Sequence, residues 1–116
     1  MADLRDARER IRAFVAEREW EPYHDPKNLA MAVASEAGEL VAELRWVASD
    51  EADAYARRED VHARLRDEAA DVAITLLMFC DRAGIDLESA IPDKLVKNAK
   101  KYPTPGHPDE TKRTGA

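Results

Sequence analysis

The chain has 116 residues, of which 45% are hydrophobic and only 6% aromatic, and its formal net charge is −6 at pH 7. This length suits one domain with a modest core, and the composition favours helices over sheets. The negative charge disfavours a nucleic-acid polymer as principal partner, because such binding needs a basic face. The charged N-terminus is atypical of a signal peptide, no apolar run reaches the roughly 20 residues that cross a bilayer, and Cys80 is the only cysteine. We therefore expect a cytoplasmic protein that does not bind membranes.

The first half of the chain predicts two helices. Residues 3 to about 19 have the spacing of an amphipathic helix, with Asp3 as its N-terminal cap. The next stretch, residues 20–27, is rich in aromatic residues and breaks the helix with two prolines. A second helix begins at Lys27 or Asn28 and runs to about residue 47. Residues 48–60 are polar and acidic, and they are consistent with a loop, a short helical turn or an early start of the next helix.

The second half predicts two more helices. The third helix ends near residue 83, because Gly84 is well suited to the position after a helix C-terminus. Asp86 can cap the fourth helix, in which Pro92 either introduces a kink or marks the true start. This helix ends at Tyr102 and the prolines after it. We expect one domain over residues 1–103 and a flexible tail over 104–116.

Four helices with short links predict an all-α, antiparallel four-helix bundle-like domain. The first and fourth helices contain few apolar residues. In a single chain they are therefore expected to cover poorly an apolar stripe at Leu76, Leu77, Met78 and Phe79. We therefore expect oligomerisation through the central helices, as a homodimer or a homotetramer.

The two central helices each carry a pair of acids three residues apart, Glu36 with Glu39 and Glu68 with Asp71. Acids at this spacing lie about 60° apart on adjacent turns of one helix face. Apolar residues recur around both pairs at a constant offset of 32 residues: Leu29, Val33, Leu40, Leu44 and Val47 match Val61, Leu65, Val72, Leu76 and Phe79. Both acid pairs are therefore predicted to lie beside a buried stripe.

Four converging carboxylates repel one another, and burying an unpaired carboxylate costs several kcal/mol. Ion pairs with Arg45, Arg66 or Lys27 are one remedy, and a divalent cation is the other. An all-oxygen ligand set, with Glu43 as a possible fifth member, suits Mg²⁺ or Mn²⁺. A di-iron centre is disfavoured because such bundles use Glu-x-x-His, whereas the second positions here are Glu39 and Asp71.

The sequence resembles the all-α nucleoside triphosphate pyrophosphohydrolases of the MazG-like superfamily. The likeness is carried by E-A-G-E at 36–39 and E-A-A-D at 68–71, and it covers about residues 8–103. Further matching positions resemble the dCTP pyrophosphatase branch: Glu19-Trp20, His24-x-Pro26-x-Asn28, Leu44-x-Trp46 and Lys94-x-x-x-Asn98-x-x-x-Tyr102-Pro103.

The resemblance implies that Glu36, Glu39, Glu68 and Asp71 are catalytic and hold Mg²⁺, and that a deoxynucleoside triphosphate is hydrolysed to its monophosphate and pyrophosphate. It implies dCTP or a modified dCTP as substrate in nucleotide-pool sanitation. The substrate-binding residues would be Trp20 and Trp46 for base stacking, His24 and Asn28 near base or sugar, Lys94 and Asn98 for phosphate or sugar, and Tyr102 to stack on or cap the pocket.

Two departures from the family pattern leave the base preference open. Ile11 stands where a histidine is expected in the animal dCTP enzymes, and Thr75 where a tyrosine is expected. Two alternative functions therefore remain. One is a dUTP-directed or general nucleoside triphosphate pyrophosphatase. The other is a non-enzymatic helical dimer whose carboxylates bind cations.

Overall fold

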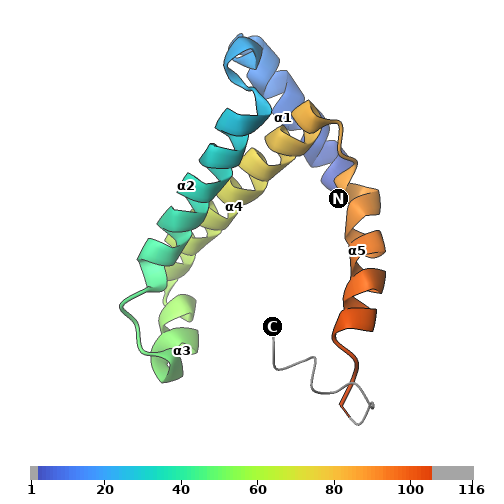
Figure 1. Ribbon diagram of the computed structural model, residues 1–116. Helices are drawn as coiled ribbons and strands as arrows, with labels where there is room; N and C mark the ends of the chain where they lie inside the picture. The colour runs from blue at the N-terminus through green and yellow to red at the C-terminus, as the bar shows by residue number, and fades with distance from the viewer. Residues whose placement is uncertain (1–2, 106–116) are drawn as a thin grey trace. The chain divides into compact units, whose positions relative to one another are not determined.

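The computed structural model describes residues 3–105. The chain divides into two compact units, Met1–Gly84 and Ile85–Ala116, and we describe each by itself. Within the described residues every regular element is helical, either α-helix or 3-10 helix (Figure 1). None of the described helices is both long and apolar enough to cross a membrane. The all-α class predicted from composition is confirmed.

Capping residues set the starts of the first two α-helices. Helix α1 spans Leu4–Glu17, and the Asp3 side chain caps it by accepting a hydrogen bond from a first-turn amide at 2.8 Å. Helix α2 spans Pro26–Leu44, and the Asp25 side chain accepts a hydrogen bond from the amide of Asn28 at 2.8 Å. Proline suits the first helical position because an N–H there would have no partner within the helix. Helix α2 therefore begins one residue before the expected Lys27.

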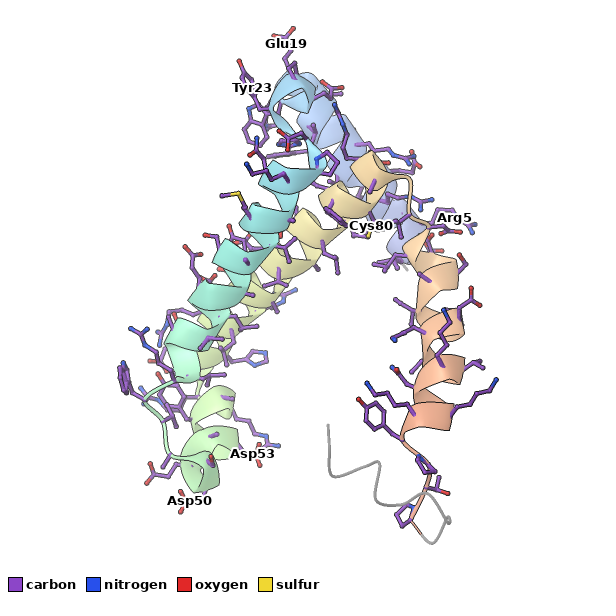
Figure 2. All side chains as sticks on the ribbon, viewed as in Figure 1. Arg5, Glu19, Tyr23, Asp50, Asp53 and Cys80 are labelled. Atoms are coloured by element: carbon purple, nitrogen blue, oxygen red, sulfur yellow. The ribbon has the colours of Figure 1, made fainter. Side chains whose placement is uncertain are left out.

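Helix α1 ends in a Schellman motif built around Glu19. The amide of Trp20 donates to the carbonyl of Val15 at 3.2 Å, and the amide of Glu19 donates to the carbonyl of Ala16 at 3.1 Å. This pattern needs a left-handed residue after the cap, and Glu19 adopts φ = 56° there. Figure 2 shows Glu19 projecting from this corner, beyond which the short 3-10 helix η1, Glu21–Tyr23, leads to α2.

The acidic segment 48–60 forms a short helix of its own, which resolves the three alternatives. A 3-10 turn, η2 (Ser49–Glu51), leads into α3 (Ala52–Arg57). Arg58 is then extended (φ −61°, ψ 137°), and this break separates α3 from α4, which spans Glu59–Ala83. Helix α4 ends as predicted, because Gly84 takes the left-handed conformation at φ = 71°.

Helices α2 and α4 run antiparallel along each other and form the body of the first unit (Figure 1). Helix α1 packs near the C-terminal end of α4, and α3 near its N-terminal end. The buried hydrophobic side chains among the described residues of the first unit are few: Val15, Leu29, Val61, Leu77 and Cys80. The core is therefore thin, and it holds α2 and α4 side by side with their acid pairs in register.

The predicted apolar stripe is not the exposed one. Leu77 is buried, and Leu76, Met78 and Phe79 are half-buried, so the expectation that these four residues are poorly covered is wrong. The large apolar side chains left exposed on α2 and α4 are Met31 at 60%, Val41 at 58% and Ile74 at 36%. The sequence misplaced the stripe because α1 covers the last turns of α4 on this side.

The second unit contains one described helix, α5, which spans Leu87–Lys101. Asp86 occupies its N-cap position, as predicted, and the helix runs through Pro92 rather than starting there. A proline cannot donate the i to i−4 hydrogen bond, yet the helix continues on both sides of it. Of the predicted tail at 104–116, the residues from 106 onward lie outside the described residues.

Candidate functional site

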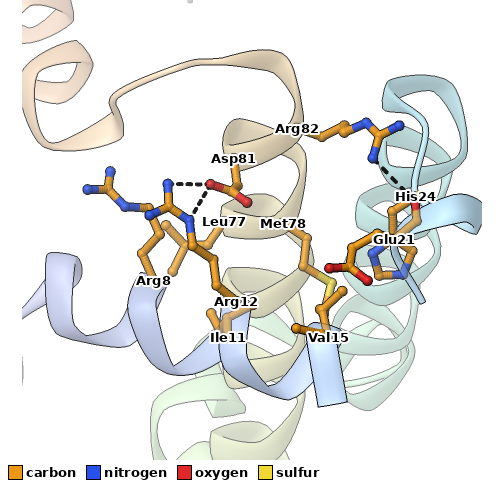
Figure 3. A pocket seen from close by; sticks show the side chains of 11 residues that line it. Arg8, Ile11, Arg12, Val15, Glu21, His24, Leu77, Met78, Asp81 and Arg82 are labelled. Carbon is orange, nitrogen blue, oxygen red and sulfur yellow. Dashed lines mark hydrogen bonds and ion pairs between the residues drawn. The ribbon is translucent and has the colours of Figure 1, made fainter. Parts of the chain in front are cut away.

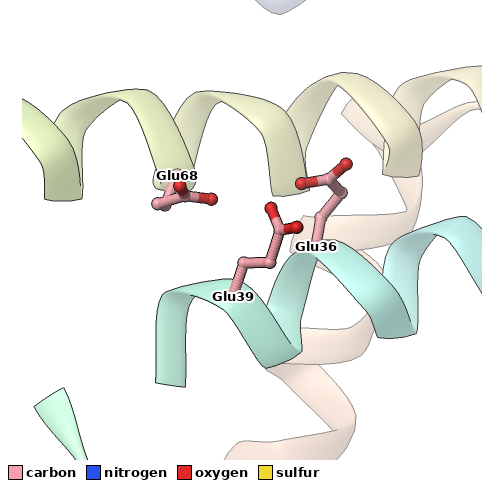
Figure 4. Close-up of side chains that lie close together, drawn as sticks. All are labelled: Glu36, Glu39 and Glu68. Carbon is pink, nitrogen blue, oxygen red and sulfur yellow. The ribbon is translucent and has the colours of Figure 1, made fainter. Parts of the chain in front are cut away.

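Three carboxylates from the two central helices converge on one point. Glu36 and Glu39 lie one turn apart on α2, and Glu68 faces them from α4 (Figure 4). One carboxylate oxygen of each residue lies within 4.8 Å of the corresponding oxygens of the other two. This convergence follows from the antiparallel packing of two helices whose acids occupy equivalent positions beside the apolar stripe. Three of the four acids that the sequence singles out are thus brought together.

The cluster is partly withdrawn from solvent. Glu36 and Glu68 are half-buried, whereas Glu39 is exposed. One carboxylate oxygen of Glu36 and one of Glu68, in each case Oε2, is buried and has no hydrogen-bond partner among the described residues. A buried carboxylate oxygen without a partner is costly, so both atoms have the donor chemistry that suits a bound cation.

Asp71, the fourth predicted acid, lies at the edge of this cluster. It is exposed, and it is not one of the three residues whose oxygens come within 4.8 Å of one another. It follows Glu68 by one turn of α4, and its negative charge contributes to the raised pKa of both Glu36 and Glu68. The backbone carbonyl of Asp71 accepts a hydrogen bond from the Thr75 hydroxyl at 3.0 Å.

Burial and mutual repulsion make two of the acids weaker. Desolvation is the main cause that raises the pKa of Glu36, and a hydrogen bond with Glu39 and the charges of its acidic neighbours add to it. Desolvation likewise raises the pKa of Glu68, followed by the charge of Glu39 and a hydrogen bond with it. Both carboxyl groups therefore hold protons more tightly than free glutamate, which is the behaviour expected where a cation would relieve the repulsion.

The fifth acid, Glu43, is paired with an arginine. Its Oε2 atom lies 3.0 Å from the Nε atom of Arg64, which projects from α4. Glu43 is not among the three converging acids, although its charge contributes to the raised pKa of Glu68. In the free chain Glu43 is thus an ion-pair partner beside the cluster rather than a member of it.

The alternative in which basic residues neutralise the four acids is not realised in the first unit. Within residues 3–84, no lysine, arginine or histidine forms an ion pair with Glu36, Glu39, Glu68 or Asp71. Arg45 instead lies over the ring of Trp46, 5.2 Å from its centroid. The donor set that remains is made of carboxylate oxygens, which suits a hard divalent cation such as Mg²⁺ or Mn²⁺.

A cavity of about 280 Å³ lies nearer the C-terminal end of α4, between α1, η1 and α4 (Figure 3). Its wall combines apolar and charged side chains, mainly Ile11, Val15, Leu77, Met78, Arg8, Arg12, Asp81 and Arg82, with His24 also lining it. Arg12 donates to Asp81 at 2.6 Å and Arg82 donates to the backbone carbonyl of Glu21 at 3.2 Å, so both arginines are held in place.

The predicted residues of the loop before α2 lie close together. The ring of Trp20 contacts Phe14 edge-to-face at 5.5 Å between centroids and lies 6.2 Å from the ring of His24. His24 lines the cavity. The Asn28 side chain donates to Asp25 at 2.9 Å and to the carbonyl of Tyr23 at 3.4 Å, so it also fastens the loop to the start of α2.

The other predicted contacts lie apart from this loop along the chain. Trp46 follows the end of α2 and is 84% exposed. Lys94, Asn98 and Tyr102 belong to the second unit, where Lys94 is exposed and Asn98 and Tyr102 are half-buried. The amide of Tyr102 donates to the carbonyl of Asn98 at 2.8 Å, which places these two residues one turn apart at the end of α5.

Sequence reasoning missed the ionic contacts between helices. Arg12 and Asp81 are 69 positions apart, and Arg64 and Glu43 are 21 apart. Each pair depends on how two helices rotate against each other, which apolar periodicity determines only coarsely. The available signal was a pair of opposite charges at matching distances from the two acid pairs: Glu43 follows Glu39, and Arg64 precedes Glu68, by four residues each.

Comparisons with known proteins agree with this architecture. The model of the MazG-like family matches residues 32–115. Rat dCTP pyrophosphatase 1 is 36% identical over 100 residues, which are 86% of this chain and 59% of the relative, and the human protein is 35% identical over the same shares. The chain thus spans about three fifths of the length of these curated relatives. A crystal structure of a pyrophosphatase from Archaeoglobus fulgidus superposes with a TM-score of 0.76 at 38% identity, covering 83% of this chain and 88% of that one.

Proposed function

Because this chain belongs to the MazG-like family, we propose that it is a Mg²⁺-dependent nucleotide pyrophosphatase that hydrolyses a nucleoside triphosphate between its α- and β-phosphates. The proposed substrate is dCTP or a modified dCTP, released as dCMP and pyrophosphate, because the relatives from rat and human are named dCTP pyrophosphatase 1. The observation that carries the proposal is the convergence of Glu36, Glu39 and Glu68 on one point from two helices.

The residues present fit a magnesium ion. Glu36, Glu39 and Glu68 would hold it, with Asp71 at the edge, and the two buried Oε2 atoms that lack partners would gain one. When bound, the ion supplies Lewis-acid polarisation of a phosphoryl oxygen and lowers the pKa of a coordinated water. An acid of this group that is left out of the coordination orients the attacking water and accepts its proton.

The position of the cavity suggests how the substrate would lie along α4, from the acids toward the C-terminal end of the helix. Met78 lines the cavity and lies seven residues after Asp71, so a rise of 1.5 Å per residue separates them by about 10 Å along the helix axis. With the triphosphate at the acids, the nucleoside would reach toward the cavity and toward His24 and Trp20. The aromatic face of Trp20 suits base stacking at this end of α2. Trp46, which follows the other end of α2, and Lys94, Asn98 and Tyr102 of the second unit remain proposed substrate contacts.

A panel of deoxynucleoside triphosphates with Mg²⁺ tests the proposal, with monophosphate and pyrophosphate as the products measured. We expect dCTP to be hydrolysed fastest, and dCTP and dUTP competing in one reaction measure the base preference. Glu39→Gln and Asp71→Asn should abolish turnover without changing the helical circular dichroism. Glu59→Gln, an exposed acid in the first turn of α4, is the matched control and should keep full activity. Inorganic phosphate as first product would refute the proposal.

Calorimetry separates the enzyme from a non-enzymatic cation-binding protein. A non-hydrolysable dCTP analogue should bind the wild-type protein in the presence of Mg²⁺. Binding of Mg²⁺ with no affinity for the analogue would support the cation-binding alternative instead.

We also propose that the chain forms a homodimer or homotetramer through α2 and α4. Met31, Val41 and Ile74 are large apolar side chains exposed on these two helices, and an oligomer interface would cover them. Light scattering should give a mass of two or four chains. Met31→Lys and Val41→Lys should lower this mass, whereas Ala13→Lys on the exposed side of α1 should leave it unchanged.

A further inference from the structure

The ion pair between Glu43 and Arg64 lies directly beside the acid cluster. Glu43 follows Glu39 by one turn on α2, and Arg64 precedes Glu68 by one turn on α4. Their side chains meet between the two helices, with 3.0 Å between Nε of Arg64 and Oε2 of Glu43. The pair therefore bridges the same two helices as the cluster, one turn closer to α3.

Glu43 has the properties of a cation ligand. It is a carboxylate on the helix that supplies Glu36 and Glu39, and its side chain is only 22% exposed. It follows Glu39 by one turn, and its charge contributes to the raised pKa of Glu68. It nevertheless stands outside the group of converging oxygens, and the contact that accounts for this is the one with Arg64.

Other contacts hold Arg64 in place. Its Nη1 atom donates to the backbone carbonyl of Asp60 at 3.4 Å, one turn earlier on α4. Its pKa lies above the usual arginine value, chiefly because of the hydrogen bond to Glu43, and a hydrogen bond with Tyr55 of α3 contributes as well. The guanidinium thus connects Glu43 of α2 with the backbone of α4 at Asp60.

We propose that Arg64 is a positioning residue that holds Glu43 out of the cation site and so makes the site selective for a small divalent cation. Mg²⁺ binds six ligands in near-octahedral geometry and keeps several waters, so a few carboxylates suffice. Ca²⁺ takes six to eight oxygen ligands at longer distances, and an added carboxylate favours it. The proposal rests on the cation site described under the proposed function, and it adds the residue that limits the ligand set.

Calorimetric titration of the nucleotide-free protein with MgCl₂ and with CaCl₂ tests the proposal. In Arg64→Met the released Glu43 should join the site, and the affinity for Ca²⁺ should rise about tenfold while that for Mg²⁺ changes little. Arg64→Lys keeps a cation for Glu43 and should restore much of the wild-type selectivity. The double variant Arg64→Met with Glu43→Gln should return to the wild-type ratio of the two affinities.

Two variants control for charge and for direct ligation. Arg66→Met removes an equal charge two residues along α4 and should leave the ratio unchanged. An equal gain in Ca²⁺ affinity in Arg66→Met would overturn the proposal, because the effect would then be one of net charge. Glu43→Gln alone should bind Mg²⁺ as the wild type does, and a loss as large as that in Glu39→Gln would also overturn it, since Glu43 would then be a ligand.

The same titration distinguishes failure of the proposed cation site from failure of the proposed role of Arg64. Wild-type protein that binds neither ion would refute the proposed cation site and this inference with it. Wild-type protein that binds Mg²⁺, with Arg64→Met showing the wild-type ratio of affinities, would refute only the role of Arg64. Thermal unfolding of each variant in EDTA confirms that the altered chains are folded.

Discussion

Glu36 of α2 and Glu68 of α4 bring carboxylate oxygens within 4.8 Å of each other, and each has one oxygen buried without a hydrogen-bond partner among the described residues. The two residues are 32 positions apart and occupy equivalent places on antiparallel helices. Their proximity is unfavourable while both carboxylates are charged and no cation lies between them.

The stability of the metal-free protein should fall as the pH rises. The folded state raises the pKa of Glu36 and Glu68 above the ordinary value of 4.5. Their contribution to stability is therefore fully present below pH 4.5 and is lost as the pH rises through the folded-state pKa. Thermal unfolding in EDTA from about pH 5 to about pH 8 should show a steeper fall for the wild type than for Glu36→Gln with Glu68→Gln. Parallel curves for the two proteins would contradict this prediction.

Magnesium should stabilise the folded protein through the same acids. A ligand that binds only the folded state adds about 2.7 kcal/mol at a concentration of 100 times its Kd. We expect the unfolding midpoint to rise with MgCl₂ in the wild type and in the control Glu59→Gln, but not in Glu39→Gln with Glu68→Gln. A rise of equal size in all three proteins would show that the ions act elsewhere.

Replacing Glu19 with glycine should stabilise the protein. Glu19 holds the left-handed position of the Schellman motif at φ = 56°, where a side chain costs about 1 kcal/mol and glycine does not. Glu19→Gly should therefore raise the free energy of unfolding by up to about 1 kcal/mol in urea titrations. Ala13→Gly, at an exposed position inside α1, should lower it by about 0.5–1 kcal/mol, because glycine there only adds freedom to the unfolded chain. Equal effects of the two glycines would exclude the backbone explanation.

The thiol of Cys80 should be protected in the native protein. The side chain is 3% exposed and burial raises its pKa, so both access and ionisation are disfavoured. Ellman's reagent should react slowly with the native protein and at once after denaturation. The control is Ala73→Cys combined with Cys80→Ser, in which the new thiol at an exposed position should react rapidly. Rapid labelling of native Cys80 would indicate frequent opening of the contact between α1 and α4.

The features that the sequence predicted correctly depend on short-range rules. Asp3 and Gly84 terminate helices because their side-chain chemistry or backbone freedom acts within one turn. The convergence of Glu36, Glu39 and Glu68 was also predictable, because the constant offset of 32 residues places both acid pairs at the same angle beside an apolar stripe. The all-α class and the family resemblance are confirmed as well.

The features that the sequence could not predict depend on how the helices meet. The stripe at Leu76 to Phe79 is covered because α1 packs on the end of α4, a contact that no local pattern specifies. The break falls at Arg58, which is extended although it is neither proline nor glycine. No helix-breaking residue therefore marks it in the sequence. The partners of Arg12 and Arg64 likewise depend on the rotation of neighbouring helices.

The antiparallel course of α2 and α4 gives the cluster an approximate local twofold axis. Under this operation Glu36 exchanges with Glu68, and Glu39 exchanges with Asp71. A single helical segment with one acid pair would bring two such pairs to face each other by pairing with its own copy. The centre is therefore built from one half-site used twice, and a synthetic peptide spanning either helix is a minimal starting point for rebuilding it.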